Sequence, residues 1–354
     1  MLTRLQQTAD LSVEQAGNIL PRRDFLSGLE LLRDERGVFV ASPSDDYRAC
    51  WIRDQLYSNF AYFYTGDFEK YKKGVYVVFD ILHRARSRIE KAISTMPTVG
   101  HEFIHAKYHH ESLREMTNDW GHHQVDAIGL FLYTVAFSQE KGISLFRCEE
   151  DKKLIQLLVD YLISIRYFES PDNGMWEEWM DLHASSLGAA VRALELLSKE
   201  KLAVVPQEAI DRGREALFTI LPNETQNRNE DMAQLSLIWP YNIVPREIAD
   251  IILKRITDRL VQSKGLNRYW GDDYYRSENG VSGEWTMGFF WLSIVYSERG
   301  NALLAQFWYK RGLETRTKEG YLPELYQNGE PNKNTPLGWA HALAIIAEKK
   351  LKLK

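Results

Sequence analysis

The feature that most constrains the fold of this chain is a long succession of segments with helical periodicity. Residues 154–168 read LIQLLVDYLISIRYF, with apolar side chains three and four positions apart, and residues 187–197 repeat the pattern. We expect about eleven helices, each with an error of a few residues in its first and last position. The others are expected at 2–20, 52–65, 67–94, 121–139, 206–220, 246–262, 284–298, 301–315 and 336–350. This succession predicts an all-α protein.

The connections between these helices alternate between short turns and long polar segments rich in aromatic residues. Gly66-Asp67 and Arg299-Gly300 are short turns. The long segments are 95–120, 169–184, 222–245, 264–284 and 316–335. Long ordered loops in a compact domain are usually functional. Helical hairpins whose long loops gather at one end predict a closed toroid with a cleft at that end. An open solenoid is the alternative, but no repeat of fixed period supports it.

No low-complexity linker divides the chain, so we expect residues 1–354 to form a single domain. Residues 1–44 are expected to be an N-terminal helix and a lead-in that pack on the barrel. The Thr335-Pro336 pair predicts the start of the last helix, with a hydroxyl cap followed by proline at the first helical position.

Charge and cysteine content exclude several classes of function. The formal net charge of −5 lacks the basic excess that nucleic-acid binding requires. No stretch approaches the ~18 apolar residues of a membrane span, and the start of the chain has no run typical of a signal peptide. Cys50 and Cys148 are too few for a disulfide framework or a thiolate metal site. We therefore expect a cytoplasmic protein that binds neither nucleic acid nor membranes. The sequence carries no signal for its oligomeric state.

Two adjacent glutamates, Glu177 and Glu178, stand between two tryptophans in the stretch DNGMWEEWMDLHASSLG. A third, Glu324, lies on another long loop, in GYLPELYQNGEPNKNTPLGWAHA. Glycoside hydrolysis needs a carboxylic acid to protonate the leaving oxygen and a carboxylate to activate water. Solvated surface charge is the alternative reading of these glutamates. Aromatic residues, including ten tryptophans and eighteen tyrosines, suit either a dense core or a cleft that stacks against sugar rings.

Two more loop stretches carry polar residues beside a tryptophan. YRACWIRDQLYS places Trp51, Arg53 and Asp54 at the start of a helix, where Asp54 alone could simply favour the helix dipole. NDWGHHQVDAIG contains Trp120 and two adjacent histidines. Adjacent helical positions point about 100° apart and do not easily share one ion, so we expect no metal there.

Five stretches resemble, in the same order, the motifs of glycoside hydrolase family 15. They are CWIRD, WGHHQVDAIG, DNGMWEE followed by HASSLGAA, NRYWGDDYY, and GYLPE followed by TPLGWAHA. The resemblance runs from about residue 45 to residue 347, and the family contains glucoamylases, glucodextranases and some trehalases. The middle portion is also similar to the glucoamylase-like domain of phosphorylase kinase α and β subunits.

The resemblance implies an (α/α)6 barrel and an inverting mechanism that releases β-glucose from the non-reducing end of a short α-glucan or related α-glucoside. No metal or organic cofactor is expected for it. By motif, Glu177 is the implied general acid and Glu324 the implied general base. The implied substrate-binding residues are Arg53 and Asp54 for the outer hydroxyls of the terminal glucose, Arg268 and Glu178 near the scissile bond, and Trp51, Trp120 and Trp285 as aromatics. We expect partial burial between Trp176 and Trp179, together with the second carboxylate, to raise the pKa of the acid.

Two departures from the family pattern qualify this expectation. Many members continue the base motif as LPEQ, whereas this chain has Leu325 after Glu324. The sequence also shows no β-sandwich or starch-binding segment, which favours short oligosaccharides over granular starch.

Three alternatives to an α-glucoside hydrolase remain for a helical toroid of this kind. The main alternative is a non-catalytic carbohydrate-binding or regulatory module of the phosphorylase kinase type. A hydrolase of unsaturated uronic-acid sugars would call for a basic cleft, which the long loops, rich in Asp and Glu, do not obviously supply. A helical interaction scaffold is opposed by the absence of a repeat and by the aromatic loops.

Overall fold

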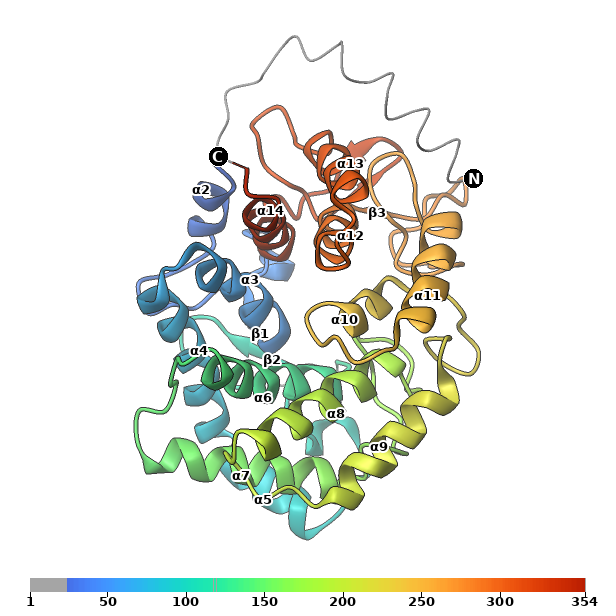
Figure 1. Ribbon diagram of the computed structural model, residues 1–354. Coiled ribbons are helices and arrows are strands. Elements are labelled where there is room, and N and C mark those ends of the chain that lie inside the picture. Colours follow the sequence, from blue (N-terminus) through green and yellow to red (C-terminus); the bar gives the residue numbers. More distant parts are fainter. Residues whose placement is uncertain (1–23, 117, 119, 354) are drawn as a thin grey trace.

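An inner ring of helices surrounds the centre of the molecule (Figure 1). The computed structural model describes residues 24–116, 118 and 120–353. Within them, each inner helix contacts the next, and the last contacts the first, so the ring is closed. In chain order the inner helices are α3 (Ile52–Thr65), α6 (Val125–Glu140), α8 (Ala184–Lys199), α10 (Leu235–Ile238), α12 (Met287–Glu298) and α14 (Gly338–Lys350).

An outer ring of helices covers the inner one. Each of the first five inner helices contacts the outer helix that follows it, and α14 contacts α2, which comes first in the described chain. These outer helices are α4 (Phe68–Arg84), α7 (Glu149–Ser164), α9 (Gln207–Ile220), α11 (Arg246–Arg259), α13 (Ala302–Leu313) and α2 (Phe25–Glu30). A further helix, α5 (Arg86–Ser94), follows α4 and packs against α7. The predicted all-α (α/α)6 barrel is confirmed.

The distribution of apolar residues in a helix explains whether the helix lies in the inner or the outer ring. The inner helix α12 reads MGFFWLSIVYSE, and every residue from Met287 to Val295 is buried. The outer helix α9 buries one stripe, formed by Ala209, Ile210, Gly213, Leu217 and Ile220, and exposes charged residues outside it. A helix that is apolar all round needs cover on every side, whereas one apolar stripe needs cover on one side.

Several helix boundaries differ from the expectation. The helix expected at 67–94 is divided at Ala85 into α4 and α5, and the short helices α2 and α10 were not expected. The helix expected at 2–20 lies outside the described residues. The predicted start of the last helix was wrong: α14 begins at Gly338 with Leu337 as N-cap, and Thr335-Pro336 is a cis peptide in the preceding loop.

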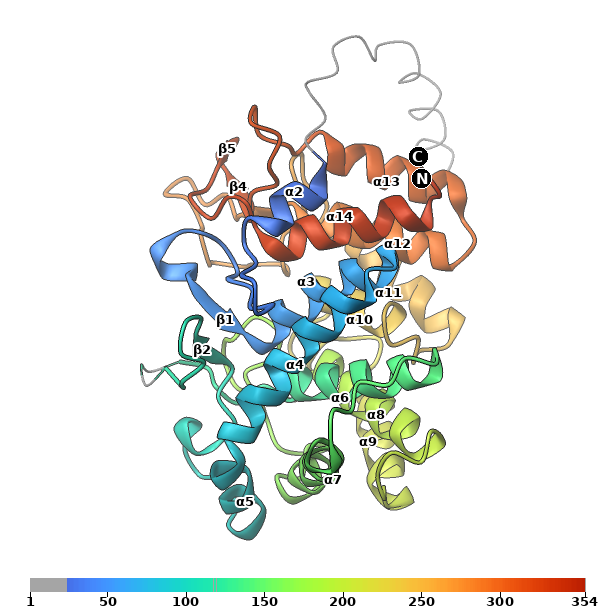
Figure 2. The same ribbon diagram turned by 90° about the vertical axis from the view of Figure 1, so that its left-hand side faces the viewer.

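Five short strands occur in the described part of the chain, at one end of the toroid (Figure 2). The strand β1 (Ala49–Trp51) pairs antiparallel with β2 (Lys107–His109). A second sheet has the order β3 (Glu284–Trp285), β4 (Leu325–Gln327), β5 (Glu330–Pro331), also antiparallel. These strands brace long loops that lead into the N-terminal ends of the inner helices. Among the described helices, none has the length and apolar content needed to cross a membrane.

Candidate active site

One pocket of about 800 Å³, open to solvent, lies among the long loops. All nine residues predicted to act on or bind substrate line it: Trp51, Arg53, Asp54, Trp120, Glu177, Glu178, Arg268, Trp285 and Glu324. They come from the segments that lead into α3, α6, α8, α12 and α14, or from the first turns of those helices. The closed ring of inner helices therefore brings together residues that are far apart in the sequence.

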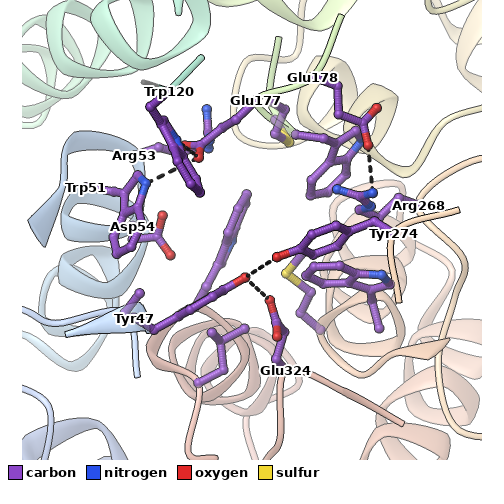
Figure 3. A pocket seen from close by; sticks show the side chains of 17 residues that line it. Tyr47, Trp51, Arg53, Asp54, Trp120, Glu177, Glu178, Arg268, Tyr274 and Glu324 are labelled. Atoms are coloured by element: carbon purple, nitrogen blue, oxygen red, sulfur yellow. Dashed lines mark hydrogen bonds and ion pairs between the residues drawn. The ribbon is translucent and has the colours of Figure 1, made fainter. Parts of the chain in front are cut away.

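The Glu177 carboxylate lies on the opposite side of the pocket from Glu324 (Figure 3). Its Oε2 accepts hydrogen bonds from the indole Nε1 of Trp120 at 2.5 Å and of Trp51 at 3.3 Å. Its Oε1 accepts one from Nη2 of Arg53 at 2.9 Å. Three fixed donors therefore hold the Glu177 carboxylate at the wall of the pocket.

The expectation that Trp176 and Trp179 frame Glu177 was wrong. Trp179 is 85 % exposed, and Trp176 donates its indole N–H to Asp231 at 2.8 Å while its ring lies near Trp285 and Trp339. Glu177 has a φ of +62°, a left-handed conformation that turns the chain and sends successive side chains in different directions. The tryptophans that contact Glu177 come from other loops.

The loop that carries both glutamates is fastened to two inner helices. Asp172 accepts hydrogen bonds from Val125 N–H at the start of α6 and from the Ser186 hydroxyl in α8, each at 2.8 Å. Asn173 donates its side-chain amide to the Glu178 carbonyl at 2.7 Å. Burial raises the pKa of Asp172 to about 7.

Arg53 is held by acceptors from three other residues. Its side chain is 3 % exposed, and its Nη1 donates to Asp126 at 2.9 Å and to Gln124 at 3.0 Å, while Nη2 bonds to Glu177. Both terminal nitrogens are thus committed to protein acceptors. Arg53 therefore lines the pocket and orients Glu177.

The Asp54 carboxylate faces the same pocket (Figure 3). Burial raises the pKa of this carboxyl to about 7, against the opposing effect of the Arg53 charge. The charges of Glu177 and Glu324 add to the increase.

Glu178 and Arg268 form a second ion pair, at 2.6 Å. Glu178 also accepts from the Tyr269 hydroxyl at 3.0 Å and from Arg228 at 3.1 Å. Arg268 is 3 % exposed and bonds Asp272 at 2.7 Å. Its guanidinium lies 5.1 Å from the centre of the Trp285 ring, so aromatic faces contribute to its position.

Glu324 is 1 % exposed and accepts three hydrogen bonds, each of 2.6 Å. The donors are the Tyr47 hydroxyl and the side-chain amides of Asn332 and Asn334. Burial raises the pKa of Glu324, and these three bonds oppose the increase. Leu325, the residue that departs from the family motif, is fully buried in the hydrophobic core and does not line the pocket.

The sequence did not single out Tyr47, Tyr274, Asn332 or Asn334. Tyr274 lines the pocket, and its hydroxyl lies 3.4 Å from that of Tyr47. Tyr274 does occur in the recognised stretch NRYWGDDYY, and the asparagines follow the base motif in GYLPELYQNGEPNKN. Both motifs therefore contained these residues, but the sequence did not predict which of the side chains point into the pocket.

The paired histidines lie against different partners. The His122 ring stacks on His105 with centroids 3.9 Å apart, and His123 stacks on Phe103 at 3.7 Å. Burial lowers the pKa of His122 to about 4 and that of His123 to about 3. Within the described residues, no group of three or more His, Cys, Asp or Glu side chains is arranged to hold a metal ion.

Curated proteins with described functions are similar to this chain. The chain is 26 % identical over 385 aligned positions to the liver isoform of the phosphorylase b kinase regulatory subunit alpha from Mus musculus, covering 87 % of this chain and 31 % of that protein. A homologue described as a probable phosphorylase b kinase regulatory subunit alpha from Caenorhabditis elegans is 26 % identical over 64 % of this chain and 23 % of its own length. The chain thus spans about a third or less of these curated relatives.

Solved structures share the fold. A glycosidase variant solved in complex with glucose has a TM-score of 0.80 at 18 % identity, covering 99 % of this chain and 98 % of that one. The glucoamylase from Saccharomycopsis fibuligera has a TM-score of 0.65 at 16 % identity, covering 96 % and 98 %. The family profile described as Glycosyl hydrolases family 15 matches residues 28–208, just over half of the sequence. The chain therefore belongs to glycosyl hydrolases family 15.

Proposed function

We propose that this protein is an inverting, exo-acting α-glucoside hydrolase that releases β-glucose from the non-reducing end of short α-glucans or related α-glucosides. The observation that carries the proposal is the placement of Glu177 and Glu324 on opposite sides of one aromatic pocket (Figure 3). Inversion needs two carboxyl groups that flank the scissile bond and leave room for water, typically ~6.5–9.5 Å apart.

In this mechanism Glu177 is the general acid that protonates the glycosidic oxygen. The present partners of its carboxylate are all donors, so a substrate oxygen would replace one of them when it receives the proton. Trp120, at 37 % exposed, is more open than Trp51, at 5 %. We therefore assign the displacement to the Trp120 indole, while Arg53 keeps the other carboxylate oxygen in place.

Glu324 is the general base that removes a proton from the attacking water. Its three hydrogen-bond donors hold both carboxylate oxygens in position. These bonds stabilise the ionised form of Glu324. The attack on the anomeric carbon from the face opposite the leaving group gives the β-anomer. Arg268 lines the same pocket as Glu177 and Glu324 and supports binding of the sugar near the scissile bond.

The aromatic lining supports a sugar as the ligand. Tyr47, Trp51, Trp176, Tyr274 and Trp285 all line the pocket, together with Arg and carboxylate groups. Flat apolar faces with a few polar groups suit a pyranose ring, which has an apolar face and hydroxyls at its rim. Maltooligosaccharides, α-1,6-linked glucosides and trehalose all share these features.

The second candidate function is a carbohydrate-binding or regulatory module without turnover. The curated relatives favour it, because their names describe regulatory subunits of phosphorylase b kinase. The two candidates share the pocket and differ in whether the bound sugar is cleaved.

A panel of α-glucosides tests both candidates, with the anomer of the product read by NMR. We expect β-glucose from the wild-type protein and its loss in Glu177→Gln and in Glu324→Gln, by about 10²-fold or more. Glu319→Gln is the matched control, because Glu319 is exposed in the same long loop as Glu324 and lies outside the pocket. Sugar binding without turnover of any α-glucoside would replace the hydrolase with the regulatory module.

A further inference from the structure

A second cavity, of about 750 Å³, lies where α4 meets α5, beside the hairpin of residues 107–116 that contains β2 (Figure 2). Within the described chain, none of its lining residues belongs to the active-site pocket. The charged residues of its lining are Arg84, Arg88, Arg114 and Glu115. The lining therefore carries an excess of positive charge.

Tyr108 lines this cavity and carries a buried hydroxyl without a hydrogen-bond partner. The residue is 1 % exposed, and among the described residues none forms a hydrogen bond with its Oη. Burial raises the pKa of Tyr108 well above its usual value, so the hydroxyl keeps its proton and can donate it in a hydrogen bond. Buried hydroxyls in proteins nearly always have a partner, so the packing of the protein alone does not explain this donor.

The direction of β2 places Tyr108 on the side away from the active site. The preceding residue, Lys107, holds its ammonium group 4.5 Å from the ring centres of both Trp51 and Trp120, which line the active-site pocket. Successive side chains of a strand point to opposite faces. Lys107 therefore faces the active site, and Tyr108 faces the cavity beside α4 and α5.

The first turn of α5 adds backbone donors to the same cavity. Ala85, the N-cap of this nine-residue helix, forms no side-chain cap, and the first turn contains no acidic residue. The first N–H groups of a helix have no partner within that helix, and they attract anions together with the helix dipole. Ala85 and Ser87 line the cavity, so the positive end of α5 faces it.

Two of the three arginines keep donors free for a ligand. Arg88 is paired with Glu115 at 2.6 Å, so the one carboxylate of the lining already has a cation. Arg84 and Arg114 are exposed, and Arg84 donates to the Ser112 carbonyl. Within the part of the chain that the structure describes, neither of these two arginines forms an ion pair. The planar fork of a guanidinium group matches the oxygens of a phosphate.

We propose that this cavity binds a phosphoryl group, either as inorganic phosphate or as part of a small phosphate ester. The Tyr108 hydroxyl and the first turn of α5 donate hydrogen bonds to the phosphoryl oxygens. Arg84 and Arg114 balance the negative charge at the rim. The site shares no residue with the active-site pocket and is detected by binding, so it does not rest on the proposed hydrolase activity.

Isothermal titration into the full-length protein, at constant ionic strength in chloride, tests the proposal. The ligands are inorganic phosphate, glycerol 3-phosphate and glycerol. We expect one saturable site for the phosphoryl compounds and no binding of glycerol. Tighter binding of glycerol 3-phosphate identifies an ester as the ligand, and tighter binding of inorganic phosphate identifies the free ion. The proposal is overturned if neither compound binds above the chloride background.

Tyr108→Phe removes only the hydroxyl that has no partner. The protein loses no hydrogen bond, so the free energy of unfolding should stay the same or rise. The affinity for phosphate should fall about ten-fold, because a hydrogen bond to a charged ligand is lost. Unchanged affinity in this variant would overturn the site.

Tyr167→Phe is the matched control for Tyr108→Phe. Tyr167 is also buried, its hydroxyl donates to the Ala209 carbonyl at 2.8 Å, and it does not line the cavity. We expect the opposite pair of results, a lower free energy of unfolding and an unchanged affinity for phosphate.

Arg114→Gln tests the contribution of charge at the rim, and we expect a loss of affinity of about ten-fold. Arg86→Gln removes the same charge from the residue that precedes Ser87 but does not line the cavity. Its affinity should change by less than about two-fold, because charges near the surface are screened by solvent and salt. Equal losses in the two variants would show a general attraction of anions to this surface and would overturn the site.

Discussion

The phenolic hydroxyl of Tyr47 donates a 2.6 Å hydrogen bond to the carboxylate of Glu324, which is 277 positions away in the sequence. Tyr47 lies just before β1, and Glu324 directly precedes β4. The bond therefore connects the first and last of the loops that form the pocket. Burial raises the pKa of Glu324, and the Tyr47 bond is the foremost of the contacts that lower it.

Replacing Tyr47 with phenylalanine removes this donor and keeps the ring. The ionised form of Glu324 loses a hydrogen bond, so the pKa of Glu324 rises further. A general base acts only when ionised, so the acidic limb of the profile of kcat/KM against pH moves to higher pH. Tyr326→Phe is the control, because the Tyr326 hydroxyl donates to the Thr315 carbonyl at 3.1 Å and not to a carboxylate. An acidic limb that stays in place, or moves to lower pH, would contradict the role given to Tyr47.

Asp126 holds Arg53 against Glu177, and Asp126→Asn tests this arrangement. Both members of the Arg53–Asp126 pair are 3 % exposed, and their contact is 2.9 Å. Removing one partner of a buried ion pair leaves an uncompensated charge, so we expect a loss of about 3 kcal/mol in the free energy of unfolding. We also expect kcat to fall, because Arg53 no longer holds the Glu177 carboxylate in one position. Urea denaturation and steady-state kinetics measure the two effects.

The control for Asp126→Asn is Glu150→Gln, which removes two exposed ion pairs, one with Lys153 and one with Arg86. Glu150 bonds Lys153 at 2.6 Å with both side chains more than half exposed. Exposed pairs contribute about 0–1 kcal/mol, so this change should leave stability and kcat close to those of the wild type. If Asp126→Asn is as mild as Glu150→Gln, then Arg53 does not depend on Asp126.

The periodic helices were predictable because burial imposes a spacing on the sequence. In α7, Leu154, Ile155, Leu158 and Leu162 are fully buried, three and four positions apart, and this pattern was visible in the sequence. The short α10 has only four residues and shows no period. The break at Ala85 is not marked by glycine or proline, since alanine is a good helix former.

The residues that line the pocket were predictable from the sequence, and their contacts were less so. Motifs identified Glu177, Glu178 and Glu324, and the pocket contains all three. The partners of Glu177 could not be inferred from its neighbours in sequence, because its φ of +62° turns the loop and leaves Trp179 in solvent. Loop residues have no period, so only the assembled barrel determines which side chains meet.

Close packing between α6 and α8 predicts that Gly129 does not tolerate a side chain. A Cβ at Gly129 would lie 2.8 Å from the carbonyl carbon of Ala189 and 2.8 Å from the nitrogen of Ala190. Alanine improves helix propensity by about 1 kcal/mol, but overpacking against backbone costs about 1–3 kcal/mol. We therefore expect Gly129→Ala to lower the free energy of unfolding by up to about 2 kcal/mol. Because the loop bearing Glu177 is fastened to both helices, kcat should fall as well.

Gly100→Ala is the control for the Gly129 substitution. Gly100 is exposed, and a Cβ built on it has no atom within 4 Å. We expect its unfolding free energy to stay within about 0.5 kcal/mol of the wild-type value in chemical denaturation. Equal stabilities for the two variants would mean that α6 and α8 can separate without cost.

The buried carboxylate of Asp151 stabilises the barrel in a way that depends on pH. It accepts from Arg147 Nη2 at 2.9 Å and from the His83 ring at 2.8 Å, which connects α7 to α4. Burial opposes ionisation of Asp151, but the hydrogen bonds from Arg147 and His83 lower its pKa to about 2. The folded protein therefore binds this proton less readily than the unfolded chain, whose aspartates titrate near ~3.9.

The contribution of Asp151 to the free energy of unfolding is complete above the pKa that this residue has in the unfolded chain. It is lost as the pH falls through the lower pKa of the folded protein. Linkage gives a contribution of about 2–3 kcal/mol at neutral pH. We expect the difference in unfolding free energy between wild type and Asp151→Asn to shrink as pH falls from about 5 to about 2, measured by urea denaturation. Val159→Ala, a cavity-forming change in the same helix, costs about 2 kcal/mol at every pH because no titrating group is removed. A wild-type–Asp151→Asn difference that stays constant with pH, as the Val159 difference does, would show that Asp151 stabilises α7 by packing and not by charge.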